Sequence, residues 1–104
     1  MKEITVTDLK SKIDNQEDIQ LIDIREEYEQ DICSIGGQLI PMGEVMGSLD
    51  KISKEKPVIV HCRSGKRSAA IVMHLETMGY ENLYNLKGGI LAWSDEIDSS
   101  ITKY

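Results

Sequence analysis

Short apolar runs alternate along this chain with stretches in which apolar residues recur every three or four positions. The runs are rich in Ile, Leu and Val and predict β-strands, whereas the recurrence predicts helices that bury one face. In residues 68–78, for example, Ile71 and Leu75 mark such a face. The predicted strands cover residues 4–6, 20–24, 39–40, 58–61 and 83–86. The predicted helices are a segment capped by Thr7 and residues 26–30, 43–52, 68–78 and 90–97.

This alternation of strands and helices predicts an α/β fold. Strands that alternate with helices form a central parallel sheet that helices cover on both faces, with right-handed crossovers. The length of 104 residues suits one domain, so we expect a single domain over residues 1–104, with a sheet of about five strands. Ligands of such sheets bind outside the carboxyl ends of the strands. The strand at residues 58–60 therefore delivers His61 and Cys62 to the functional edge.

The distribution of charge narrows the classes of function. The chain has 12 Lys and Arg against 18 Asp and Glu, which gives a net charge of −6. Nucleic-acid binding is not expected, because phosphates are bound by clustered positive charge. Residues 61–67 (HCRSGKR) nevertheless contain three of the 12 cations and no acid. This pattern predicts a local anion site inside an acidic protein.

The sequence also favours a cytoplasmic protein that makes no membrane contact. No apolar run approaches the roughly 20 residues that span a bilayer, and the first residues (MKEITVTDLKSK) lack the apolar centre of a signal peptide. Cys33 and Cys62 are the only cysteines, too few for a disulfide scaffold, so reduced thiols are expected. One disulfide between them is the alternative. The spacing of the two cysteines and two histidines matches no zinc pattern.

The segment from residue 62 to residue 68 combines several features that activate a thiol. A thiolate is favoured by a helix N-terminus and by cations, and Arg63, Lys66 and Arg67 lie just before a predicted helix. Gly65 allows this short connection to turn its N–H groups inward as an anion nest. A cysteine in such a nest can attack an electron-poor sulfur or phosphorus atom and carry the transferred group. A lone cysteine would be interpreted as a buried structural residue, but this combination favours a nucleophile.

Over nearly its whole length the chain resembles the rhodanese family of sulfurtransferases. The resemblance rests on residues 21–26 (LIDIRE), Tyr28, the loop at residues 61–68 and residues 86–93 (LKGGILAW). The loop and the G-G-x-x-x-W element are together specific to this family. The resemblance implies a rhodanese-like domain in which Cys62 forms a persulfide. The loop residues that it implies in substrate binding are Arg63, Ser64, Gly65, Lys66, Arg67 and Ser68.

The length of the loop separates this chain from related phosphatases of the dual-specificity cell-cycle type. Those enzymes place an arginine six positions after the cysteine, whereas rhodanese-like loops place the basic residue five positions after it. Here Arg67 is five positions after Cys62, and Ser68 is at the sixth. The shorter loop suits a sulfane sulfur better than a tetrahedral phosphate, so phosphatase activity is disfavoured.

Two further segments resemble a narrower group within the family. Residues 31–41 (DICSIGGQLIP) and 93–98 (WSDEID) look like the rhodanese domain at the C-terminus of ubiquitin-activating-enzyme-like adenylyltransferases. Those proteins serve molybdopterin, thiamin or tRNA thiolation. Many family members instead have G-H-I-P-G-A in the first segment. The adenylyltransferase domain itself is absent, which leaves an isolated domain and a free-standing relative as alternatives.

The resemblance implies a reaction that needs no metal or organic cofactor. The Cys62 thiolate takes a sulfane sulfur from thiosulfate or a protein persulfide, and a thiol or a sulfur-carrier protein then removes it. The N–H groups of residues 63–68 hold the anionic persulfide, and the cations of the loop attract the small anionic donor. The alternative is a non-catalytic sensing or docking module, against which the intact nucleophile argues.

The remaining polar residues are interpreted as structural. We expect Cys33 to be a bystander in a loop without cations around it. The run Glu26, Glu27, Glu29 and Asp31 is interpreted as a solvated acidic face, and a structural pair between Asp23 and Arg25 near the site is a further hypothesis. Three further residues are also expected to be structural. His61 closes a strand, His74 lies on the flank of a helix, and Trp93 packs in the core.

Overall fold

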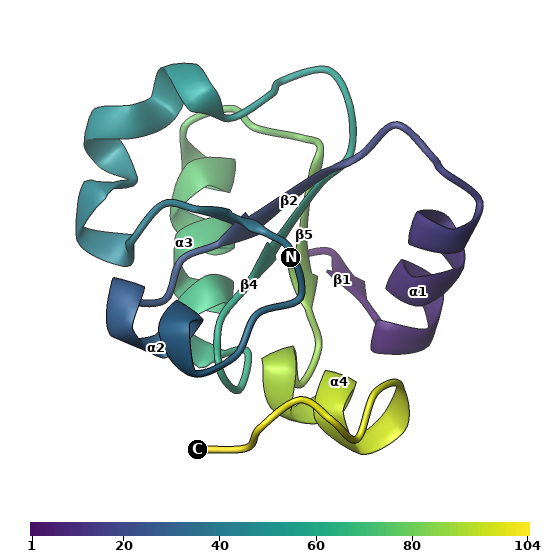
Figure 1. Cartoon of the computed structure of the whole chain (residues 1–104). Coiled ribbons are helices and arrows are strands. Elements are labelled where there is room, and N and C mark those ends of the chain that lie inside the picture. The colour runs from purple at the N-terminus through teal and green to yellow at the C-terminus, as the bar shows by residue number, and fades with distance from the viewer.

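The computed structural model describes residues 1–104 and contains one five-stranded parallel sheet (Figure 1). Its strands lie in the order β1-β5-β4-β2-β3. The strands are β1 (Glu3–Ile4), β2 (Gln20–Asp23), β3 (Gln38–Leu39), β4 (Val58–His61) and β5 (Leu83–Leu86). The helices are α1 (Val6–Asp14), α2 (Glu27–Ile32), α3 (Lys66–Thr77) and α4 (Gly89–Glu96), with 3-10 turns η1 (Met42–Glu44) and η2 (Met46–Lys51).

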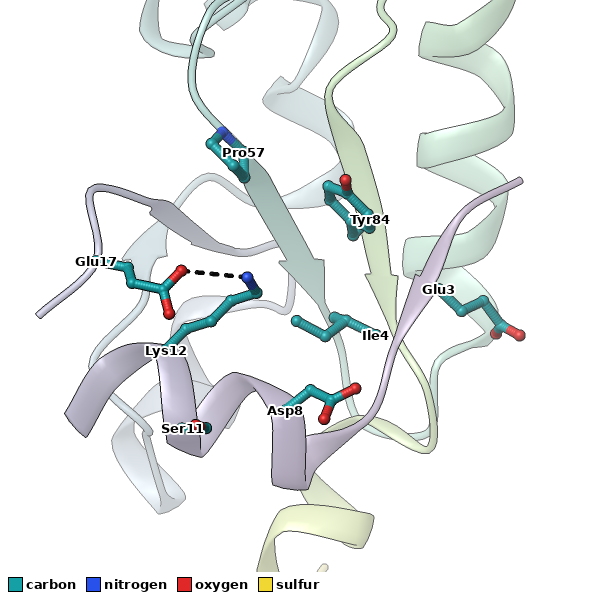
Figure 2. A pocket seen from close by; sticks show the side chains of 8 residues that line it. All are labelled: Glu3, Ile4, Asp8, Ser11, Lys12, Glu17, Pro57 and Tyr84. Atoms are coloured by element: carbon teal, nitrogen blue, oxygen red, sulfur yellow. Dashed lines mark hydrogen bonds and ion pairs between the residues drawn. The ribbon is translucent and has the colours of Figure 1, made fainter. Parts of the chain in front are cut away.

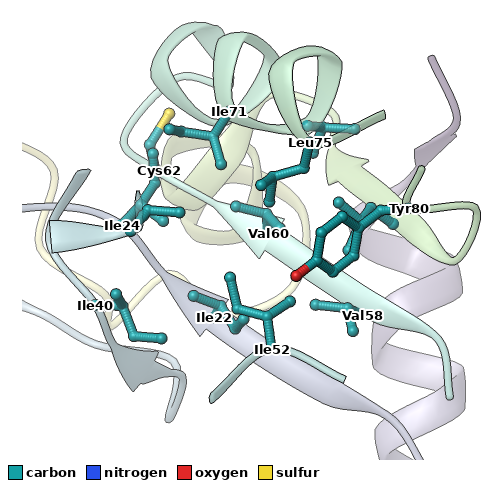
Figure 3. Close-up of a cluster of buried hydrophobic side chains, with 13 residues drawn as sticks. Ile22, Ile24, Ile40, Ile52, Val58, Val60, Cys62, Ile71, Leu75 and Tyr80 are labelled. Atoms are coloured by element: carbon teal, nitrogen blue, oxygen red, sulfur yellow. The ribbon is translucent and has the colours of Figure 1, made fainter. Parts of the chain in front are cut away.

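The central strand β4 is buried at every position, because both faces of the sheet are covered. Side chains alternate between the faces of a strand, so Val58 and Val60 join one core cluster and Ile59 joins the other. The first cluster packs under α3 (Figure 3), and Met42 and Leu49 of the 3-10 turns pack against it. The second packs under α1 and α4 and contains Trp93. The prediction of a parallel α/β sheet covered on both faces is confirmed, as is a core position for Trp93.

Two local predictions are wrong. Thr5, rather than Thr7, caps α1, and its hydroxyl accepts the N–H of Asp8 at 3.1 Å. Both threonines suit a cap, but β1 ends early enough for the helix to begin at Val6. Residues 43–52 form no α-helix, since 3-10 turns replace it with a break at Ser48. Two glycines in this segment lower its helical propensity.

The helices are all short or amphipathic. None of them is both long enough and apolar enough to cross a bilayer.

Candidate active site

Cys62 follows β4 directly and lies at the carboxyl edge of the sheet, where the sequence places it. The residue is 1% exposed. Its Sγ accepts the N–H of Gly65 at 3.1 Å and the N–H of Ser68 at 3.5 Å, and the hydroxyl of Ser68 lies 3.3 Å away. Hydrogen-bond donors from the loop thus converge on the sulfur, which is the nest that the sequence predicts.

The backbone of Gly65 explains how the loop turns inward. Gly65 has φ +101°, in the left-handed region that favours glycine, and it is the residue from which α3 starts. A Cβ at this position would lie 3.3 Å from the N atom of Gly88 and 3.4 Å from the carbonyl oxygen of Leu86. Because the loop closes here, α3 begins at Lys66, two residues before its predicted start.

The pKa of the Cys62 thiol lies below its ordinary value as the result of opposing effects. Burial disfavours the thiolate and raises the pKa. Hydrogen bonds to the sulfur outweigh burial, and they come from the side chain and N–H of Ser68 and from the N–H groups of Gly65 and Ser64. The loop therefore stabilises the charged, nucleophilic form of Cys62.

Asn85 on β5 completes this arrangement and was not anticipated from the sequence. Its Oδ1 lies 2.5 Å from the Ser68 hydroxyl, and its Nδ2 donates to the carbonyl oxygen of Gly65 at 3.2 Å. The Ser68 hydroxyl has one proton, so it donates either to Asn85 or to Cys62, and ionisation of the sulfur favours the second. The only signal in the sequence was a lone amide inside the buried strand 83–86.

These contacts predict a measurable effect of Ser68 on thiol reactivity. Wild-type Cys62 should react with iodoacetamide at mildly acidic pH, where an ordinary thiol of pKa about 8.5 is mostly protonated. In Ser68→Ala, loss of a hydrogen bond to the thiolate should slow this reaction at pH 6 by about five- to tenfold. Site-resolved mass spectrometry from pH 5 to pH 9 measures the rates.

Ser64→Ala is the matched control, because the Ser64 side chain is exposed and only its N–H group contributes to the thiolate. Its alkylation profile should match that of the wild type. Equal pH profiles for Cys62 and Cys33 in the wild type would show that the loop does not activate its cysteine.

The cations of the loop differ from one another in their surroundings. Arg67 binds Glu29 through two hydrogen bonds, of 2.7 Å and 2.8 Å. Arg63 is half-buried and Lys66 is exposed, and neither forms an ion pair with a carboxylate. The charge of Arg67 is thus compensated within the protein, whereas those of Arg63 and Lys66 are not.

Glu29 therefore does not belong to a solvated acidic face, as the sequence had suggested. It is 3% exposed, and it also accepts the N–H of Glu26 at 3.1 Å in a capping box. The hydrogen bonds from Arg67 are the main reason that the pKa of Glu29 is lowered to about 2, although burial opposes the change. Its neighbours Glu26, Glu27 and Asp31 are exposed as expected. A run of acids gave no sign that one turn of α2 would point a carboxylate inward.

The hypothesis of a structural pair between Asp23 and Arg25 is confirmed. Both side chains are fully buried, and Arg25 Nη2 lies 2.8 Å from Asp23 Oδ2. Arg25 also donates to the carbonyl oxygen of Cys33 at 2.7 Å and lies 3.7 Å from its sulfur. The expectation that Cys33 has no cation near it is therefore wrong, because the chain after α2 returns to the buried guanidinium.

His61 is buried at the end of β4, in the structural position expected from the sequence. Its Nε2 lies 3.9 Å from Asp23 Oδ2, too far for a hydrogen bond. Burial lowers the pKa of His61, and the nearby Asp23 opposes this only in part. His61 is accordingly a neutral core residue near neutral pH.

Tyr104 is the third site residue that sequence analysis did not identify. Its hydroxyl donates to Glu29 Oε2 at 2.6 Å and accepts from Arg25 Nη1 at 3.0 Å. The centre of its ring lies 5.1 Å from the Cζ atom of Arg63. No periodicity or motif marks Tyr104, which lies 41 positions from Arg63 and is brought to it only by the fold.

The first turn of α4, which begins at Gly89 after the N-cap Gly88, holds the loop from its other side. The N–H of Ile90 donates to the carbonyl oxygen of Cys62 at 3.0 Å, and that of Leu91 donates to the carbonyl oxygen of Arg63 at 3.1 Å. Gly89 has φ +58°, and a Cβ there would lie 2.5 Å from the Arg63 oxygen and 2.7 Å from the Cys62 oxygen. The first turn of α4 can contact the loop backbone this closely only with glycine at position 89.

A separate cavity of about 370 Å³ lies away from this chemistry (Figure 2). It is lined by residues of β1, α1 and β5 and by Pro57, which precedes β4, whereas Cys62 follows the carboxyl end of that strand. Its cation Lys12 is already paired with Glu17 at 3.2 Å. No cysteine lines the cavity, and the candidate site is therefore the loop around Cys62.

The fold is a parallel α/β sheet, and a nest of N–H groups at its carboxyl edge surrounds a cysteine. These two features define the class as an α/β protein with an activated cysteine. The family model described as Rhodanese-like domain matches residues 5–96, and the chain belongs to this family. A relative named sulfurtransferase from Allochromatium vinosum is 35% identical, and the match covers 90% of this chain and 89% of the relative. The structure of a rhodanese-like domain protein from Staphylococcus aureus superposes with a TM-score of 0.83 at 31% identity, covering 100% of this chain and 99% of the other.

The narrower resemblance to adenylyltransferases also has a counterpart among known proteins. The adenylyltransferase and sulfurtransferase uba4 of Ogataea parapolymorpha is 34% identical over 87 residues, which cover 81% of this chain. The match spans only 22% of the length of that relative. The rhodanese-like family, and a similarity to the rhodanese part of such two-function proteins, are thus both confirmed.

Proposed function

We propose that this protein is a sulfurtransferase that carries a sulfane sulfur as a persulfide on Cys62. The observation that carries the proposal is the set of N–H and O–H donors around Cys62 Sγ, which favours the thiolate. The same donors suit the anionic outer sulfur of a persulfide, because they remain in place after transfer. The names of the sulfurtransferase relatives support this class of reaction.

Thiosulfate, a small anionic donor, illustrates the reaction. The Cys62 thiolate attacks the sulfane sulfur, a new sulfur–sulfur bond forms, and the old bond breaks so that its electron pair leaves with sulfite. A thiophilic acceptor then attacks the outer sulfur of the persulfide, and the thiolate is regenerated. The acceptor is cyanide in the laboratory, and we propose a thiol or a sulfur-carrier protein in the cell. Every step is a nucleophilic displacement at sulfur, which needs no cofactor.

The surroundings of the three cations suggest different roles for them in this reaction. Arg63 and Lys66 form no ion pair and are proposed to attract the anionic donor. Arg67 is proposed to hold the loop against α2 through Glu29.

We further propose that residues 1–104 act as one domain. The reaction is proposed to take place in the reducing cytoplasm, which keeps thiols available.

Mass spectrometry after treatment with thiosulfate tests the proposal. The protein should gain one sulfur atom on Cys62 and none on Cys33, and cyanide should remove it with formation of thiocyanate. A protein persulfide offered as donor should give the same product. A docking module, the alternative, would gain no sulfur from either donor, and sulfur found on Cys33 alone would contradict the proposed nucleophile.

A further inference from the structure

Arg63 is the one cation of the loop that is both half-buried and without a carboxylate partner. Burial restrains its side chain more than that of the exposed Lys66. Its guanidinium charge and its N–H groups are not used by an acid, in contrast to those of Arg67. An arginine in this state, one residue after the nucleophile, is suited to bind an anion that approaches Cys62.

An aromatic ring supports this arginine. The ring of Tyr104 lies 5.1 Å from the Cζ atom of Arg63, within the range of a cation–π contact. A carboxylate at this place would neutralise the guanidinium and occupy its N–H groups. An aromatic face restrains the same group and leaves most of its charge available to a ligand.

Tyr104 is itself held in place by contacts on both sides of its hydroxyl. The hydroxyl donates a hydrogen bond to Glu29 Oε2 at 2.6 Å and accepts one from Arg25 Nη1 at 3.0 Å. Burial, followed by the hydrogen bond to Glu29, raises the pKa of Tyr104 to about 12, so the phenol stays neutral. The ring therefore has a defined position relative to α2 and the loop.

The segment that leads to Tyr104 is anchored as well. After α4 it runs back toward α2 (Figure 1). The Ser94 hydroxyl donates to the carbonyl oxygen of Ile101 at 2.7 Å, and the Ile101 side chain packs against the second core cluster. An ion pair between Lys103 and Asp95 adds a further tie to α4.

We propose that Tyr104 is a positioning residue that keeps Arg63 ready as an uncompensated cation and so sets the preference of the site for anionic sulfur donors. The proposal rests on the proposed function and adds to it a residue that sets the preference for anionic over uncharged donors. Tyr104 acts here through Arg63 and does not touch the reacting sulfur.

The test compares Tyr104→Leu and Tyr104→Phe with the wild type. Loss of the cation–π contact in Tyr104→Leu should raise the KM for thiosulfate about two- to fivefold, with kcat and the KM for an uncharged organic polysulfide unchanged. Tyr104→Phe retains the ring but loses both hydrogen bonds, and its KM should fall between the two. Tyr28→Leu is the control, since Tyr28 on α2 is 66% exposed, and its KM should equal that of the wild type.

A binding measurement separates failure of this proposal from failure of the proposed function. Thiosulfate is titrated into Cys62→Ser and into Cys62→Ser/Tyr104→Leu and followed by NMR, which requires no sulfur transfer. The double variant should bind about two- to fivefold more weakly. Equal affinities, or a tighter double variant, would overturn the role of Tyr104 even in an active enzyme. Weaker binding accompanied by an equal rise in KM for the uncharged donor would also overturn it, because such a loss is structural.

Discussion

Cys62→Ser is expected to reduce sulfur transfer from thiosulfate to cyanide to the uncatalysed rate. A serine hydroxyl occupies nearly the same volume as the thiol and can accept the same N–H groups, but it cannot form a persulfide. The free energy of unfolding should therefore change by less than about 1 kcal/mol, because no buried donor is left without a partner. Thiocyanate formation and denaturant unfolding measure the two quantities.

Cys33→Ser is the matched control for this substitution. Cys33 contacts Arg25 mainly through its carbonyl oxygen, at 2.7 Å, and only weakly through its sulfur, at 3.7 Å. Serine at this position should keep most of the activity. A dead Cys33 variant beside an active Cys62 variant would reverse the assignment of the nucleophile.

The fold could be predicted because its three central strands, β5, β4 and β2, are continuous in sequence and mostly apolar. β4 and β5 have the predicted bounds, and β2 differs from its prediction by one residue. Burial of both faces follows from such runs, since a strand without polar alternation has no face for water. Helix starts were less predictable, because Thr5 and Thr7 are equally good caps and the length of β1 decides between them.

The centre of the site could be predicted for a related reason. Residues 62–68 are contiguous, so the nucleophile, the glycine and the cations are all visible in one segment. Glu29, Asn85 and Tyr104 reach the site from α2, β5 and the end of the chain. Their roles depend on distances between elements, which periodicity does not contain. Whether the charge of Arg67 is compensated could not be judged for the same reason, because its partner Glu29 lies 38 residues away.

The L-K-G-G segment was predictable in part. The resemblance identified the segment from the sequence, but only the structure explains why its second glycine, Gly89, is needed. The N–H groups of the next two residues of α4 donate to the carbonyl oxygens of Cys62 and Arg63. These hydrogen bonds place the backbone of the helix against the backbone of the loop. A methyl group at position 89 would overlap both carbonyl groups, at 2.5 Å and 2.7 Å. Backbone atoms cannot rotate away as a side chain can, so the loop or the helix must move.

Gly89→Ala is therefore expected to lower both stability and activity. Overpacking against the loop, together with the left-handed backbone at φ +58°, should cost roughly 2–4 kcal/mol of unfolding free energy. A displacement of the loop by about 1 Å should reduce kcat/KM about a hundredfold. Alkylation of Cys62 at pH 6 should also slow, because its N–H donors move.

Gly79→Ala separates overpacking from backbone strain, since Gly79 has φ +97° but a Cβ there would meet no heavy atom within 4 Å. That variant should lose only the backbone cost of about 1–2 kcal/mol and keep full activity. If Gly89→Ala behaved like Gly79→Ala in unfolding, kinetics and alkylation, the contact between α4 and the loop would not be what holds the N–H groups on the sulfur.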